Sequence, residues 1–304
     1  MIHEFEPTHF HTTIGSHEPV LRVASGDVIR TWTVDSGGYD RHGDDLTDGG
    51  NPQTGPFYVE GAERGDTLRV RFDRIRPNRT RGVTGGVVAP NVVDPGFVPQ
   101  LSPRDSEDWW TLDLERGTAR LEDPPPGLES LGEITLEPML GCFGVAPPQG
   151  QAISCATSGE HGGNMDYRGF REGVTVDFPV FAEGALLHVG DGHALQGDGE
   201  IVGTGIEVSM DVELSVEVLK GKTICWPRAE DETFVMAVGN ARPLDQAVQH
   251  ATTELLKLLR DDYGLDYRAG SALLGQFIRY DVGNVFDPAY TMVAKVEKAL
   301  LERL

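Results

Sequence analysis

The sequence predicts an α+β protein that is predominantly β, with a β-rich body and a helical C-terminal portion. Apolar and polar residues alternate over much of residues 20–75 and 173–219, and a period of two is typical of strands. The 38 glycines and 19 prolines among 304 residues favour many short strands joined by turns. After Asn240 the apolar residues recur at spacings of three and four, which indicates helices.

The first half of the chain supplies strands and extended connections. Gly-Asp precedes an alternating run at Gly26-Asp27 and again at Gly65-Asp66, so a turn leads into a strand both times. Residues 76–130 are less regular and rich in proline. Within them, "WWTLDLERGTARLE" predicts a short hairpin that turns at Arg116-Gly117. The following "GCFGVAPP" at 141–148 is apolar enough to be buried.

The second half contains the clearest strand and the helices. From 211 to 218 apolar and polar residues alternate, which predicts a strand with one wet face. Residues 244–263 form an amphipathic pattern that Gly264 closes, and a second helix is expected at about 269–280. The tail from Thr291 predicts a final strand and then a short helix.

We expect two parts that pack as one compact unit. Residues 1–130 form an N-terminal β-rich part, and residues 131–304 carry a glycine-rich loop and the terminal helices.

Charge and cysteine content limit the possible partners. A formal net charge of -22 disfavours nucleic acid and anionic membranes, because both require a positive surface. The three cysteines are widely spaced and fit reduced thiols in a cytoplasmic protein. The N-terminal residues lack the apolar core of a signal peptide, and no run approaches eighteen apolar residues.

The stretch "HVGDGHALQGDGE", residues 188–200, interrupts strand-like sequence with a glycine-rich loop that concentrates carboxylates and imidazoles. Asp191 and His193 are two residues apart, so on an extended backbone both side chains project to one side. Carboxylate and imidazole are ligands for zinc, manganese or calcium. A glycine-rich hairpin with solvated carboxylates is the alternative interpretation.

Two further clusters of acidic and imidazole side chains also lie beside strand-like sequence. One surrounds a Gly-Gly pair, whose N–H groups can face an oxyanion; its members are Glu160, His161, Asn164 and Asp166. The other contains Asp35, Asp40, His42, Asp44 and Asp45. Each cluster alone also fits a solvated turn, whereas three clusters at strand ends can converge on one pocket.

Five distinctive blocks occur in order along nearly the whole chain. They are "NPQTGPFYVEGAERGDTLRV" (51–70), "GCFGVAPP" (141–148), "GGNMDYR" (162–168), "VGDGHALQGDGEIVGTGIE" (189–207) and "FDPAYTMVAKV" (286–296). Together they resemble the acetamidase/formamidase family. The resemblance implies an α+β enzyme with a β-sandwich-like body that hydrolyses small amides to a carboxylate and ammonia. It also implies a divalent metal, zinc or alternatively calcium, and a homo-oligomer, which we expect to be a dimer.

The resemblance implies site residues as well. Asp35, Asp191 and His193 match metal ligands, while Asn164 and Asp166 match pocket residues. Our mechanistic hypothesis assigns general acid and base catalysis to Glu160 or Asp166. It assigns oxyanion stabilisation to Asn164 or to the Gly-Gly N–H groups.

Other polar residues of the blocks have supporting roles in this hypothesis. Asp198 and Glu200 shape the loop or hold ligands in place, and Glu207 can face inward. His188 precedes the loop within strand sequence and is expected to be a core histidine.

Two alternatives remain at the sequence level. The chain can be a non-enzymatic β-sandwich module with a structural calcium site, in which coordination is closed rather than open. It can also be a hydrolase of urea-like or cyclic amides instead of linear ones.

Overall fold

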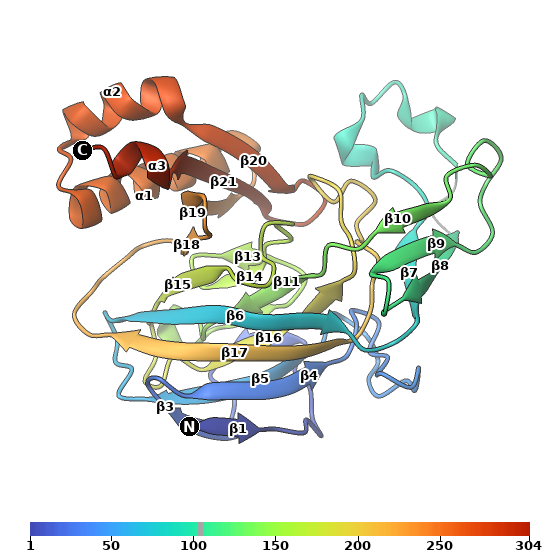
Figure 1. Ribbon diagram of the computed structural model, residues 1–304, viewed down its shortest axis with the longest axis horizontal. Coiled ribbons are helices and arrows are strands. Elements are labelled where there is room, and N and C mark those ends of the chain that lie inside the picture. Colours follow the sequence, from blue (N-terminus) through green and yellow to red (C-terminus); the bar gives the residue numbers. More distant parts are fainter. Residues whose placement is uncertain (103–105) are drawn as a thin grey trace.

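The computed structural model describes residues 1–102 and 106–304 and contains two large β-sheets with helices at one end (Figure 1). In the described residues, the larger sheet has nine strands in the order β1 (Ile2–Glu4), β4 (Val28–Thr33), β17 (Met210–Leu219), β6 (Thr67–Pro77), β15 (Thr175–Pro179), β18 (Arg228–Glu230), β19 (Phe234–Ala241), β21 (Tyr290–Glu297) and β20 (Arg279–Asn284). Its neighbouring strands are antiparallel except for the parallel pair β1–β4.

The second sheet faces the first and holds most of the residues that later matter for the site. Its six described strands run in the order β13 (Ser158–Gly159), β14 (Gly162–Asn164), β11 (Met139–Gly144), β16 (Leu187–His193), β5 (Gln53–Glu60) and β3 (Leu21–Ala24). Strand β16 lies between β11 and β5, and its seven residues are all buried.

The main core lies between these two sheets. Phe72 on β6 meets Phe143 on β11 edge to face, with ring centroids 4.9 Å apart, so a contact joins the two layers directly. Val70 and Leu214 of the larger sheet belong to the same apolar cluster as Leu187 of the smaller one. This packing confirms the predicted β-sandwich-like body.

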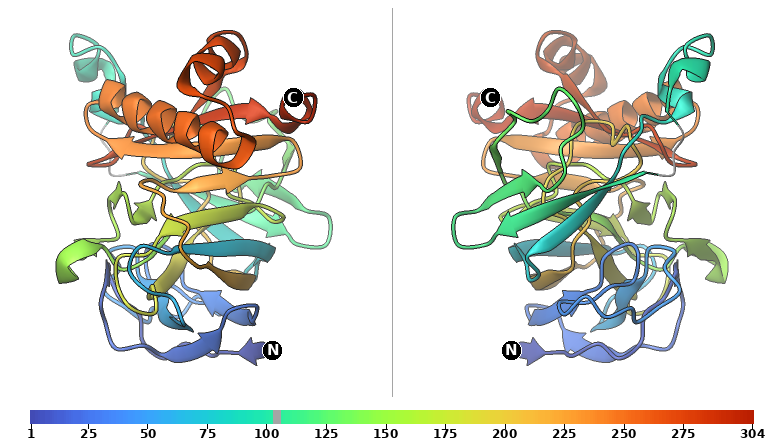
Figure 2. Two further views of the ribbon diagram at one scale, coloured as in Figure 1. Left: turned by 90° about the vertical axis from the view of Figure 1, so that its left-hand side faces the viewer. Right: turned by 90° about the vertical axis from the view of Figure 1, so that its right-hand side faces the viewer.

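The helical portion covers one end of the larger sheet (Figure 2). Helix α1 (Leu244–Tyr263) packs Leu255 and Leu259 against β19 and β21, and Gly264 ends it in the left-handed region at φ 70. Helix α2 (Tyr267–Phe277) and helix α3 (Lys298–Leu301) complete this layer. No helix of residues 1–102 or 106–304 is both long and apolar enough to cross a membrane.

A smaller sheet extends from the body beside the site. The predicted hairpin is present as β8 (Glu107–Asp113) and β9 (Thr118–Leu121), which pair antiparallel. Its other two strands, β7 (Arg81–Gly85) and β10 (Glu133–Thr135), were not predicted from the sequence. Helix α2 ends three residues earlier than expected, because β20 begins at Arg279.

Short elements complete the described chain. Strands β2 (Thr13–Gly15) and β12 (Ala152–Ser154) form a two-stranded sheet, and three 3-10 turns lie at Pro90–Val92, Val98–Gln100 and Pro148–Gly150. Strands from before and after residue 130 pair with one another in both large sheets. The division into two parts at that residue stays a prediction.

Candidate metal-binding active site

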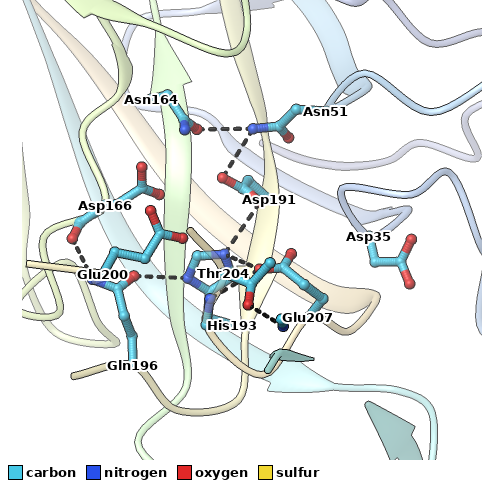
Figure 3. A network of polar contacts seen from close by, with 12 residues as sticks. Asp35, Asn51, Asn164, Asp166, Asp191, His193, Gln196, Glu200, Thr204 and Glu207 are labelled. Atoms are coloured by element: carbon cyan, nitrogen blue, oxygen red, sulfur yellow. Dashed lines mark hydrogen bonds and ion pairs between the residues drawn. The ribbon is translucent and has the colours of Figure 1, made fainter. Parts of the chain in front are cut away.

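Six buried titratable side chains from distant parts of the sequence meet beside the end of β16, and all of them except Asp287 are labelled in Figure 3. We call them the acidic cluster: Asp166, Asp191, His193, Glu200, Glu207 and Asp287. Asp191 and His193 lie on β16 itself, and Asp166 follows β14 by two residues. Glu200 and Glu207 come from the glycine-rich segment after β16, and Asp287 comes from the turn between β20 and β21. The cluster therefore depends on the pairing of strands that are remote in sequence.

His193 is held by contacts on both ring nitrogens. Its Nε2 lies 3.2 Å from Asp191 Oδ1 and 2.9 Å from Glu207 Oε1, and its Nδ1 lies 2.8 Å from Gln196 Oε1. The amide of Gln196 in turn donates to the carbonyl of Asp166 at 2.5 Å. The imidazole is thus fixed in orientation by carboxylates on one side and an amide on the other.

Three asparagines connect the carboxylates of the cluster. Asn51 donates to Asp191 Oδ2 at 3.0 Å and to Asn164 Oδ1 at 2.8 Å (Figure 3). Asn164 donates onward to Asp287 Oδ2 at 2.6 Å. Asn284 donates to Asp166 at 2.7 Å, to Asp287 at 2.8 Å and to Glu200 at 3.0 Å. These neutral donors orient four carboxylates, Asp166, Asp191, Glu200 and Asp287, without neutralising their charge.

Burial and the negative charge of the neighbouring carboxylates shift the pKa values of the side chains in the cluster. Burial raises the pKa of Asp166 and of Glu200 well above their usual range, and Glu200 and Asp191 add to the effect at Asp166. Burial also raises the pKa of Asp287 to about 6. At His193 burial opposes protonation, but the carboxylates of Glu207 and Asp191 raise its pKa well above the ordinary value. Without a bound cation the cluster therefore retains protons.

The backbone around the site is strained at four positions. Asn51, Asp166, Asp191 and Glu200 are not glycines, yet their φ angles are 58, 43, 60 and 48. Left-handed φ costs energy for residues with a side chain and collects where function requires a particular orientation. Here it turns three carboxylates and one amide toward a common centre.

The cluster fits a divalent cation. In the described residues, three overlapping sets have ligand atoms within 4.8 Å of one another: Asp166 with Asp191 and His193, His193 with Glu200 and Glu207, and Asp166 with Glu200 and Asp287. Two of the buried carboxylate oxygens, Asp166 Oδ1 and Glu207 Oε2, have no hydrogen-bond partner. A buried unpartnered carboxylate oxygen is costly, and a cation would satisfy it.

The residues predicted from the sequence are placed in different surroundings. Asp191, His193 and Asp166 come together, and Asn164 reaches the same network. Asp35 is also buried, but its Oδ2 lies 2.5 Å from Arg79 Nη2 and it belongs to none of the three sets. Glu160 lies half-buried in the turn between β13 and β14, outside these sets. The catalytic and metal roles assigned to these residues stay predictions.

The supporting residues also differ from one another. Glu200 and Glu207 are buried in the cluster, whereas Asp198 is exposed and lies 3.7 Å from Arg168. His188 is fully buried, as expected of a core histidine. The sequence analysis missed Asn51, Asn284 and Asp287 as members of the network, although Asn51 and Asp287 fall inside two of the quoted blocks.

Comparisons with known proteins agree with these features. A model of the acetamidase/formamidase family matches residues 149–243, which include β14, β16 and the glycine-rich segment. An acetamidase of Mycolicibacterium smegmatis is 46% identical over 216 residues, which cover 55% of this chain and 53% of that protein. The chain spans about half the length of the curated relatives it matches first.

Two solved structures are similar over almost their whole length. A recombinant predicted acetamidase/formamidase from the thermophile Thermoanaerobacter tengcongensis superposes with a TM-score of 0.85 and is 30% identical, covering 100% of this chain and 98% of that one. An acetamidase from Bacillus halodurans has a TM-score of 0.84 and 28% identity, covering 99% of each chain.

Proposed function

Because the chain belongs to the acetamidase/formamidase family, we propose that it is a metal-dependent hydrolase of linear C–N bonds in small amides. In this reaction an amide and water give a carboxylate and ammonia. The observation that supports the proposal most strongly is the acidic cluster, which buries five carboxylates and one imidazole within reach of one another. Such a group is costly to bury unless protons or a cation compensate its charge.

Asp191 and His193 are the proposed ligands, because they lie two residues apart on β16 and belong to the same group of converging ligand atoms. An imidazole among carboxylates favours zinc over calcium, which prefers oxygen ligands throughout. Asp35 would need to leave Arg79 before it could join them. When bound, a divalent ion supplies Lewis acidity toward the amide carbonyl and lowers the pKa of water.

The chain's own groups supply the proton transfers and the positioning. An amide nitrogen is a poor leaving group, so a proton must reach it as the C–N bond breaks. Asp166 is the preferred donor, since its Oδ1 is buried and unpartnered beside His193. Glu160 remains a candidate for the same role from the β13–β14 turn. Asn164 and the neighbouring Gly162-Gly163 backbone are the proposed groups that steady the oxyanion.

The test is metal analysis of the purified protein together with an ammonia-release assay. We expect about one divalent ion per chain and ammonia from formamide or acetamide that a chelator abolishes and zinc restores. A tightly held ion without ammonia release from any amide would instead favour a structural calcium or zinc site in a binding module. Release only from urea-like or cyclic amides would favour the second alternative.

Further proposals concern the protein's partners and its location. The net charge of -22 supports a small-molecule substrate rather than nucleic acid or an anionic membrane, both of which bind positive surfaces. The exposed rings of Tyr263, Tyr267 and Phe277 at the helical end support a homo-oligomer, with a dimer as our expectation. Light scattering would test this expectation. The free thiols support a cytoplasmic location.

A further inference from the structure

A cavity of about 800 Å³ borders the acidic cluster and leads away from it. Glu207 belongs to both, since it lines the cavity while its Oε1 lies 2.9 Å from His193 Nε2. Within residues 1–102 and 106–304, its second oxygen, Oε2, has no hydrogen-bond partner. The cavity therefore reaches the edge of the proposed reaction centre, from where a substrate can present an amide to it.

The size of the cavity exceeds what a short amide needs. Cavities of about 300–1,000 Å³ enclose most of a drug-sized ligand, whereas acetamide has only four non-hydrogen atoms. A substrate of that size would leave most of this volume to water, and the surrounding residues would contribute nothing to its binding. The volume fits an amide whose acyl part carries a bulky group.

The charge of the lining indicates that this group is neutral. Three arginines line the cavity, and each has a carboxylate partner: Arg79 with Asp35 at 2.5 Å, Arg81 with Glu122 at 2.8 Å and Arg41 with Asp211 at 3.7 Å. An anionic substrate would have to break one of these pairs. A cationic one would lie against the guanidinium groups. Of the carboxylates in the lining, Asp35 and Glu207 already contact Arg79 and His193, and Glu107 is exposed to solvent.

Aromatic side chains supply the apolar part of the lining. Trp109 on β8 and Tyr39 both face the cavity, with Val83 of β7 nearby in the lining. The Arg81 guanidinium lies 4.1 Å from the centre of the Trp109 ring and is itself fixed by Glu122, so the indole is held in place from one side. A planar apolar ring can pack against such a surface at low entropic cost.

We propose that this cavity is an aryl-binding subsite and that the preferred substrates are uncharged primary amides with an aromatic acyl group. The amide group lies toward Glu207 and His193, and the ring lies beside Trp109. This assignment rests on the proposed amide hydrolysis and adds the substrate class to it.

The experiment compares kcat/KM of the zinc-loaded protein for phenylacetamide, acetamide and the anionic amide succinamate. We expect phenylacetamide to be the best of the three by about tenfold or more, which is typical of a filled apolar subsite. Trp109→Ala should lower the ratio of kcat/KM for phenylacetamide to that for acetamide about tenfold, mainly through KM. Trp109→Phe, which keeps a ring, should recover most of the ratio.

Trp226→Ala is the matched control, because Trp226 is also half-buried and also stacks on another side chain, His250, but lies outside the cavity lining. It should leave the substrate ratio unchanged. A parallel measurement titrates phenylacetamide into the wild type and Trp109→Ala and follows binding by saturation-transfer NMR.

The possible outcomes separate the two proposals. Hydrolysis of acetamide with no preference for phenylacetamide, or with a preference for succinamate, would overturn the subsite and leave the proposed function intact. If no amide is hydrolysed with any divalent ion, the proposed function is wrong, and the titration decides the subsite. Binding that Trp109→Ala weakens supports the subsite, and absence of binding overturns it.

Discussion

Asp191 and His193 are separated by one residue on β16, and their side chains meet with Oδ1 and Nε2 3.2 Å apart. Each is also held from its other side, Asp191 by Asn51 and His193 by Gln196. Burial acts to raise the pKa of Asp191. The imidazole of His193 and the hydrogen bond from the Asn51 amide outweigh this effect and keep the pKa of Asp191 below its ordinary value. Asp191 is therefore the carboxylate of the cluster that is best prepared to act as an anionic ligand.

Asp191→Asn should remove metal binding while preserving the shape of the site. Asparagine has nearly the same size as aspartate but lacks the negative charge. We expect metal retention after dialysis and the rate of ammonia release each to fall by at least about 100-fold, which exceeds the effect of losing a supporting residue. Elemental analysis and the amide assay measure the two quantities.

Asp198→Asn is the control for this change, because Asp198 belongs to the same glycine-rich segment but its side chain is 66% exposed. Asp198→Asn should leave metal retention and the rate of ammonia release unchanged. A folded Asp191→Asn protein that keeps its metal and its rate would show that the cluster is not the metal site.

Gly141→Ala should displace two carboxylates of the acidic cluster, because the added methyl group would lie against them. Gly141 lies on β11, and a Cβ there would overlap Asp166 Oδ1 and come within 2.7 Å of Asp191 Oδ2. Both carboxylates would have to move, since Gly141 on β11 cannot retreat from its paired strand β16, on which Asp191 lies. We expect metal retention per folded molecule to fall about tenfold or more.

Gly144→Ala separates this effect from simple crowding. Gly144 lies on the same strand, and a Cβ there would overlap the carbonyl oxygen of His161 and come within 2.9 Å of Gly163 N instead of meeting the cluster. Both variants should lose stability, by about 1–3 kcal/mol as is usual for crowding in a core. Equal metal retention in the two variants would contradict the proposed positions of Asp166 and Asp191.

Local sequence patterns predicted the elements that depend on neighbours along the chain. The alternation at 211–218 became β17, and the amphipathic run before Gly264 became α1. The same kind of pattern placed Asp191 and His193 on one side of a strand. Periodicity of this kind reports which face of an element is buried.

The parts that depend on contacts remote in sequence were not predictable in this way. Asn284 at the end of β20 and Asp287 in the turn after it reach the cluster from more than 80 residues beyond Glu200, because β20 and β21 continue the larger sheet. Gly141 has no recognisable motif, and its importance appears only when the carboxylates beside it are known. Asp35 follows a strand as expected, but its pairing with Arg79 depends on the approach of residues 44 positions away.

A buried ion pair between β18 and α1 should stabilise the packing of the helical layer on the larger sheet. Arg228 on β18 and Glu254 on α1 are both almost completely buried, with Arg228 Nε 2.8 Å from Glu254 Oε1. Glu254→Gln would leave the guanidinium buried without its nearest carboxylate, and Asp261, 3.4 Å away, would compensate only in part. We expect a loss of about 2–4 kcal/mol in the free energy of unfolding.

Urea unfolding of Glu254→Gln and Glu297→Gln measures this loss against a control. Glu297 pairs with Arg279, and both side chains are substantially exposed, so Glu297→Gln should change stability by less than about 1 kcal/mol. Equal losses in the two variants would show that the buried pair contributes no more than a surface pair.

His188 should make stability depend on pH between about 6.5 and 3. Burial, together with the nearby imidazoles of His17 and His11, lowers its pKa to about 3. Above pH 6.5 the residue is neutral in both the folded and the unfolded chain. Below pH 6.5 the unfolded chain gains a proton that the folded chain refuses until about pH 3, so stability falls by roughly 1.4 kcal/mol per pH unit from this group.

His188→Asn should remove that contribution while keeping an N–H group for the carbonyl of Leu186, which His188 Nδ1 contacts at 3.0 Å. Urea unfolding in the presence of a chelator, measured between pH 4 and 6, should show a shallower pH dependence by up to about 1.4 kcal/mol per unit. Val189→Ala, a buried change on the same strand, should lower stability equally at every pH and leave the slope unaltered. An unchanged slope in His188→Asn would mean that His188 takes up its proton in the folded protein as readily as in the unfolded chain.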